Sequence, residues 1–195
     1  MKKSLLKILC SAVIAVSLAS CASIPEPSEK KDNLLYGQVE FNFSCIPNNY
    51  GIPEASTEKG GIEVKFRNIK TNKTITMTTN YRGEFAKAGI PAGTYIIHSL
   101  KKKIKYASAY EAEYSATFDK NKTTNFHFKP VSNAVVNMGK ISLDISITDI
   151  GYYRWSVNWG KGYDETYNNF ASHYLESAWL DKDWLTPQET LPKRY

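Results

Sequence analysis

Residues 141–148 read Ile-Ser-Leu-Asp-Ile-Ser-Ile-Thr, so large aliphatic side chains alternate with polar ones. A period of two places the aliphatic side chains on one face of an extended strand and the polar ones on the other. A strand with one apolar face needs a second layer to cover that face. This stretch therefore predicts a half-buried β-strand.

The same alternation recurs on both sides of this stretch, with glycine, proline and asparagine between the segments. Longer examples are residues 39–45, 62–67 and 153–159, and shorter strands fit residues 74–79, 84–88, 94–100 and 124–129. So many short strands separated by turn residues predict an antiparallel β-sandwich.

Residues 105–118 permit two interpretations. Four aromatic residues, Tyr106, Tyr110, Tyr114 and Phe118, lie four positions apart and would share a face in a strand or in a helix. Tyrosine, serine and threonine suit a pleated sheet better than a helix, which favours a strand. The helix stays the alternative.

From Asp164 onward the apolar period lengthens to that of a helix. The predicted stripe consists of Tyr167, Phe170, Ala171, Tyr174, Leu175, Ala178 and Trp179. Asp164 is the predicted N-cap, and the helix should end near Trp179 or Leu180, before an extended tail with Pro187 and Pro192.

Two turn motifs lie close together in residues 79–95. The first reads Thr79-Asn80-Tyr81-Arg82-Gly83-Glu84-Phe85, and the second Ile90-Pro91-Ala92-Gly93-Thr94-Tyr95. Gly83 permits the positive φ of a tight turn, and Pro91 with Gly93 forms a second turn that returns Tyr95 to the core.

These motifs resemble the signature of the carboxypeptidase-regulatory-like, or prealbumin-like, sandwich domains. Asn80 replaces the usual aspartate, which preserves the turn because both side chains can cap it. The resemblance spans residues 36–147, with specific matches only in 79–95, and residues 148–195 have no counterpart in it. It implies an antiparallel prealbumin-like β-sandwich. The periodic patterns after residue 148 add a C-terminal strand and one α-helix, so the expected fold is mainly β.

The N-terminal residues have the anatomy of a secretory signal. Lys2, Lys3 and Lys7 precede an apolar run over residues 8–18, which is too short to span a membrane. Leu18-Ala19-Ser20-Cys21 resembles the lipobox of bacterial lipoproteins, which implies cleavage before Cys21 and acylation of its sulfur. Ala22 follows the anchor instead of aspartate, a pattern that implies the outer membrane in a two-membrane bacterium.

Four segments follow from these observations. Residues 1–20 form the signal peptide, and residues 21–33 form a lipidated, flexible tether that is rich in proline and charge. Residues 34–148 form the sandwich, and residues 149–195 add a strand, a helix and a tail packed on it.

Charge and cysteine content exclude several classes of protein. Removal of the three N-terminal lysines lowers the formal net charge from +6 to +3, too mild for a nucleic-acid partner. Cys45 is then the remaining thiol beside the acylated Cys21, so no internal disulfide is expected, and its alternation with Phe41 and Phe43 predicts a buried, inert thiol.

No pattern of residues indicates an active site or a cofactor. His98, His127 and His173 stand alone, without the spacing of a metal site, so we expect no metal and no cofactor. Nucleophile and phosphate-loop motifs are missing from the sequence, so we expect no enzymatic activity.

Aromatic residues supply the candidate binding site. Those singled out are Tyr152, Trp155, Trp159, Trp179 and Trp184 in the last third of the chain. Flat rings can stack on sugars or anchor protein interfaces. The alternative, which we favour, is that a helix packs its aromatic stripe across the sandwich.

The sequence therefore predicts a lipid-anchored envelope protein that acts as a non-catalytic interaction or structural module. A carbohydrate-binding surface lipoprotein is the alternative, and an envelope enzyme is a second, weaker one. The expected partners are the membrane, through Cys21, and an envelope protein or glycan; the oligomeric state stays open.

Overall fold

The computed structural model describes residues 24–29, 31–45, 55–105, 111–118, 127–149 and 152–192. Most of these residues belong to strands, as the sequence predicts for a mainly β protein with one α-helix. The strands are β1 (Asn33–Cys45), β2 (Ala55–Glu58), β3 (Glu63–Asn68), β4 (Thr74–Thr78), β5 (Glu84–Ala88), β6 (Tyr95–Lys105), β7 (Glu111–Thr117), β8 (His127–Phe128), β9 (Ala134–Asp149), β10 (Tyr152–Lys161) and β11 (Asp183–Leu185). Helix α2 spans Tyr163–His173, and a 3-10 helix, η3, spans Ala178–Asp181.

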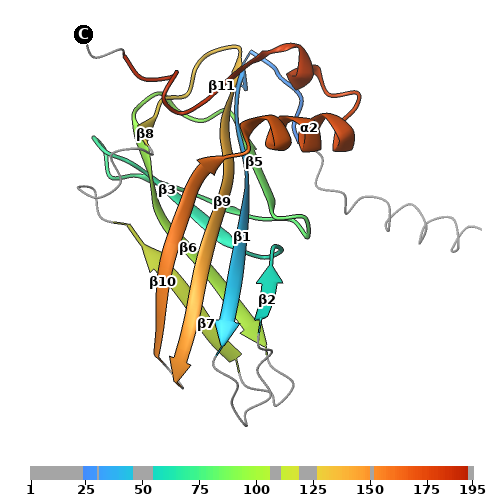
Figure 1. The fold of residues 1–195 in the computed structure, drawn as a ribbon. Coiled ribbons are helices and arrows are strands. Elements are labelled where there is room, and N and C mark those ends of the chain that lie inside the picture. Colours follow the sequence, from blue (N-terminus) through green and yellow to red (C-terminus); the bar gives the residue numbers. More distant parts are fainter. Residues whose placement is uncertain are drawn as a thin grey trace, which may run out of the picture.

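The strands form two sheets (Figure 1). The first sheet has the order β10-β9-β1-β2, with β5 beside the first half of β1 and β11 beside the first residues of β9. The second sheet has the order β4-β3-β6-β7, and β8 pairs with β6.

The expectation of a wholly antiparallel sandwich is wrong in the middle of the first sheet. β1 and β9 run parallel from Asn33 beside Ala134 to Cys45 beside Ile147, and β11 is also parallel to β9. The other ladders are antiparallel. Alternation within a strand reports which face is buried but not the direction of its neighbour, so the sequence pattern could not reveal this pairing.

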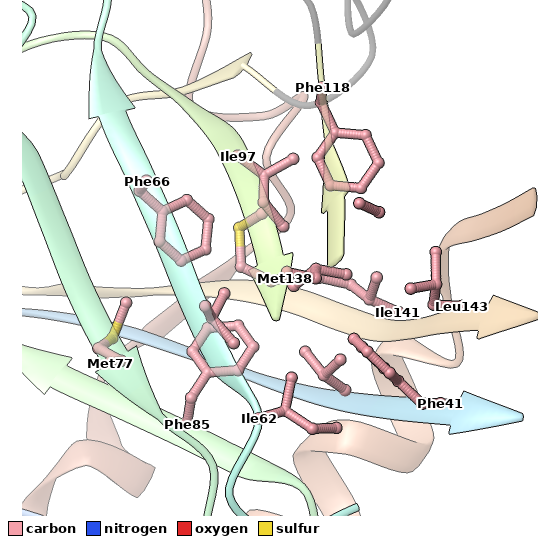
Figure 2. Close-up of a cluster of buried hydrophobic side chains, with 14 of the residues drawn as sticks. Phe41, Ile62, Phe66, Met77, Phe85, Ile97, Phe118, Met138, Ile141 and Leu143 are labelled. Atoms are coloured by element: carbon pink, nitrogen blue, oxygen red, sulfur yellow. The ribbon is translucent and has the colours of Figure 1, made fainter. Parts of the chain in front are cut away.

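An apolar core fills the space between the two sheets, and Figure 2 shows Phe41, Ile62, Phe66 and Phe85 pointing into it. The predicted strand over residues 141–148 lies inside β9, and Ile141, Leu143 and Ile145 are buried as expected. We call this set of side chains the inter-sheet core.

The ambiguous stretch of residues 105–118 is a strand in its described part. β6 ends at Lys105 and β7 runs antiparallel to it from Glu111, while residues 106–110 lie outside the described residues. Of the strand expected over residues 124–129, His127 and Phe128 are described and form β8.

A second layer covers the outer face of the first sheet at one end, where α2 crosses it (Figure 1). We call this layer the cap: residues 24–26, α2 with Tyr174, η3 and β11. A second apolar cluster joins the cap to the sheet and consists of Ile24, Leu34, Tyr36, Val135, Phe170 and Trp179.

Helix α2 differs from the predicted helix at both ends. Gly162, not Asp164, is the N-cap, because its left-handed φ of 69° turns the chain out of β10. Asp164 lies in the first turn, where its charge suits the helix dipole. The helix stops at His173, and Trp179 reaches the interior from η3 instead.

The segment expected to be a flexible tether is packed at its first described residues. Ile24 is buried, Trp179 donates its indole N–H to the carbonyl of Pro25 at 2.8 Å, and Glu26 accepts from the backbone of Ala178 at 2.9 Å. Proline and charge suggested a solvated linker, but the isolated Ile24 side chain packs into the apolar cluster under the cap.

The expected boundary at residue 148 falls inside β9, and β10 and β11 both pair with that strand. Residues 152–192 therefore complete the sandwich and its cap. The signal segment and Cys21 lie outside the described residues, as does the side chain of Cys45. Among the described helices, none has the length and apolar character to cross a bilayer.

Candidate functional site

The candidate site begins at the turn between β4 and β5, which is built as the sequence predicts. The side-chain oxygen of Asn80 accepts from the backbone N–H groups of Arg82 at 2.9 Å and Glu84 at 3.0 Å. Gly83 has a φ of 84°, and a Cβ on it would lie 2.5 Å from the carbonyl oxygen of Val39. The turn is therefore fixed both by its own side chain and by contact with β1.

The turn presents a buried carboxylate, Glu84, on the outer face of the first sheet. Its Oε1 accepts from the hydroxyl of Tyr36 at 3.1 Å and lies 2.6 Å from Nδ1 of His173. Its Oε2 accepts from the amide of Asn80 at 2.7 Å and the hydroxyl of Tyr174 at 3.3 Å. One carboxylate thus joins β1, the turn and the end of α2, and we call these five residues the Glu84 cluster.

Burial of this charge requires such partners, because an unpaired carboxylate away from water is very costly. The Glu84 side chain is 2% exposed. The carboxylate accepts hydrogen bonds from its other three partners. We therefore place the hydrogen of the fourth bond on Nδ1, so that His173 also donates to Glu84.

The same charge perturbs the two tyrosines. Burial, followed by the charge of Glu84, raises the pKa of Tyr174 to about 12. Burial and then Glu84 also raise the pKa of Tyr36 far above its ordinary value. Both hydroxyls therefore stay protonated and act as donors to the carboxylate.

A pocket of about 430 Å³ opens beside the Glu84 cluster, below α2. Its floor is formed by Gln38, Val39 and Glu40 of β1 together with Lys140 of β9. Glu40 forms an ion pair with Lys140 at 3.0 Å and accepts from Ser142 at 2.9 Å. Burial alone would raise the pKa of Glu40, but the hydrogen bonds from Lys140 and Ser142 outweigh it and lower that pKa.

One face of α2 forms the wall of this pocket. Glu165, Asn169 and His173 lie four residues apart, and side chains at that spacing share a helix face. Asn169 donates to the side-chain oxygen of Gln38 at 3.2 Å, which fixes the wall to the floor.

The rim is formed by Lys59, Tyr81 and Arg82. The Arg82 guanidinium lies 4.8 Å from the centroid of the Tyr81 ring. Neither Lys59 nor Arg82 has a carboxylate within 4.0 Å in the part of the chain that the structure describes. The pocket therefore offers cations, amides and carboxylate oxygens over a rigid base.

The five aromatic residues predicted as a binding site do not gather on one surface. Trp179 is fully buried in the cap, and Trp184 packs edge-on against Phe170 with the ring centroids 4.9 Å apart. Trp159 and the half-exposed Trp155 both lie edge-on to Phe118 at the side of the inter-sheet core. Tyr152 is 72% exposed at the start of β10.

The three histidines lie in different places. His98 and His127 are on β6 and β8 of the second sheet, whereas His173 is at the pocket. Within the described ranges, no three histidine, cysteine, aspartate or glutamate residues are close enough to hold a metal ion.

Sequence reasoning missed Glu84 and its pairing with His173. Alternation with the buried Phe85 indicates a solvent-facing Glu84, but His173 and Tyr174 of the cap, about ninety positions later, cover it. The one local signal was the place of Glu84 within the turn motif, and glutamate is common at such positions on exposed strands.

Comparisons with known proteins identify no family. No protein-family model matches the chain, and no curated protein is detectably similar to it. Among solved structures, a leucine-rich repeat protein from Bacteroides thetaiotaomicron is 17% identical with a TM-score of 0.32. That match covers 58% of this chain and 14% of the other, so the chain spans a small part of its length.

Proposed function

We propose that this chain is a lipid-anchored protein of a bacterial cell envelope and acts as a non-catalytic binding module, with the pocket below α2 as its ligand site. The observation that carries the proposal is the Glu84 cluster. It fixes β1, the turn and α2 around a polar pocket before any ligand arrives. Preorganisation of this kind lowers the entropic cost of binding.

Anchoring at Cys21 is supported by the lipobox-like Leu18-Ala19-Ser20-Cys21. Ile24 packs in the cap only three residues later, so its Cα lies within about 11 Å of that of Cys21 by chain length alone. A lipid on Cys21 would thus hold the cap end of the molecule close to the membrane. The residue Ala22 supports the outer membrane in a two-membrane bacterium.

A non-catalytic role is supported by the side chains of the pocket. Its lining, within the described residues, contains no serine, threonine or cysteine that could act as a nucleophile. Glu40 in the pocket and Glu84 beside it both accept from protein donors, so these two carboxylates act in holding the site together. The resemblance of residues 79–95 to prealbumin-like domains supports a sandwich whose turns present a site. The partner would be an envelope protein or a glycan, not a nucleic acid.

Hydrogen exchange of the full chain tests the binding role. We expect a detergent extract of the cell envelope to slow exchange in residues 36–40, 80–84 and 165–173, and we expect the rim variant Arg82→Gln to weaken this protection. Unchanged exchange in all three segments would contradict a ligand site at the pocket. A ligand recovered with altered mass would contradict the non-catalytic role.

The anchor has a separate test. Wild-type protein should incorporate labelled palmitate and sediment with membranes, and Cys21→Ser should do neither. Membrane retention of the Cys21→Ser variant equal to that of wild type would contradict lipidation.

A further inference from the structure

We infer that the pocket below α2 binds an acidic saccharide, that is, a sugar unit bearing a carboxylate or phosphate group. This inference names the ligand class of the site in the proposed function and rests on that function. Three features of the pocket support it: two cations without an ion-pair partner, a carboxylate without an ion-pair partner, and an exposed ring on a rigid turn.

The cations at the rim have no carboxylate close to them among the described residues. Lys59 and Arg82 form no ion pair with a described carboxylate, whereas Lys101 and Lys103 on β6 pair with glutamates of β7 at 2.8 and 3.4 Å. Arginine and lysine beside a pocket favour an anionic ligand, and arginine can bind a carboxylate or phosphate through two parallel hydrogen bonds.

The carboxylate of Glu165 in the pocket wall makes a simple anion an unfavourable ligand. Glu165 lines the same pocket, and its carboxylate forms no ion pair with a described residue. A simple anion would be repelled by this carboxylate, so the ligand must also supply donors. Hydroxyl groups next to an acidic group meet both demands, and the Gln38–Asn169 amide pair can exchange hydrogen bonds with them as well.

The rim adds a flat ring. Tyr81 is 75% exposed, and the Asn80 turn that carries it is tied to the buried Glu84. A rigid exposed ring can stack on the C–H face of a sugar at little entropic cost. The pocket volume of about 430 Å³ lies within the usual range for small ligands.

An array of immobilised ligands, probed with the full chain in a detergent without a sugar headgroup, tests the class. The array would carry uronic-acid, phosphorylated and neutral oligosaccharides together with polyglutamate peptides. We expect binding to the acidic saccharides. Calorimetry should then show that the counterpart lacking the acidic group binds at least about tenfold more weakly, the loss of roughly one charge-assisted hydrogen bond.

Two variants and a matched control sharpen the test. Arg82→Gln should weaken the acidic ligand about tenfold and leave the neutral counterpart unchanged, while Tyr81→Ala should weaken both. Lys70→Gln removes an exposed positive charge at the β3–β4 turn, outside the pocket, and should change neither affinity.

Equal affinity for acidic and neutral saccharides, preference for polyglutamate, or no binding to any probe would each overturn the inference. If envelope extract still protects the pocket from hydrogen exchange in those cases, the binding role survives without the saccharide. If the extract gives no protection either, both the binding role and the saccharide ligand are wrong.

Discussion

The inter-sheet core and the cap differ in what they bury. The inter-sheet core, as far as the structure describes it, is a cluster of apolar residues such as Phe41, Phe66 and Ile141. The cap covers its own apolar cluster, but beside that cluster it also covers the ionisable Glu84. Apolar packing tolerates many arrangements of similar volume, whereas a buried carboxylate is stable only where its donors lie in the correct places.

This difference assigns separate roles to the two layers. The inter-sheet core provides most of the buried apolar surface and holds the two sheets together. The Glu84 cluster determines where the turn and α2 lie over the first sheet, and so it shapes the pocket. Stability and site geometry should therefore respond differently to changes in each layer.

The largest expected effect is in the inter-sheet core. Phe41→Ala should lower the free energy of unfolding by about 4 kcal/mol, because it leaves a cavity between the sheets. Trp179→Ala in the cap should lower it less, since the cap can open without separating the sheets. Denaturant unfolding measures both variants, and hydrogen exchange should speed up in α2 for Trp179→Ala alone. Equal losses of unfolding free energy in the two variants, with hydrogen exchange that speeds up evenly along the chain, would show that the two layers unfold as one unit.

The next effect is in the Glu84 cluster. Glu84→Ala should cost about 3 kcal/mol, because Tyr36, Asn80 and Tyr174 lose their acceptor inside the protein. The matched control is Glu63→Ala, which breaks a half-exposed ion pair with Lys65 and should cost about 0.5 kcal/mol. Urea unfolding measures both variants. Similar losses of unfolding free energy would show that the buried Glu84 contributes no more to stability than an exposed ion pair.

A smaller effect should appear at alkaline pH. The folded protein raises the pKa of Tyr174 from 10 to about 12, so the stability that this group contributes is complete below pH 10 and is lost as pH rises toward 12. Tyr174→Phe should lose less stability than wild type over that range. Equal alkaline losses in wild type and Tyr174→Phe would contradict the raised pKa.

Sequence and structure agree best where a single strand contains the whole signal. The alternation in residues 141–148 and the turn residues Asn80 and Gly83 predicted local structure correctly, because period and φ are local properties. The parallel pairing of β1 with β9 was not predictable in this way, since it depends on contacts about a hundred residues apart.

The candidate site was harder still to predict. Of the two interpretations of the aromatic residues in the last third of the chain, Trp179 and Trp184 fit the favoured one, because they serve the packing of the cap. Glu84 and His173 each looked like an ordinary polar surface residue, and only the position of α2 on the outer face of the first sheet brings them together. The hydrophobic period of one strand or helix does not show which distant side chains come into contact.

A double-mutant cycle between Glu84 and His173 tests most directly whether this pair organises the cap. Urea unfolding of Glu84→Ala, His173→Ala and the double variant should give a coupling free energy of about 2 kcal/mol. The same cycle on the surface pair of Lys101 and Glu113 should give a much smaller coupling free energy, because water screens that pair. The opposite result is that the losses of unfolding free energy in the two single variants add up to the loss in the double variant, with no more coupling than in the surface pair. That result would contradict the account in which the buried carboxylate holds α2 in place.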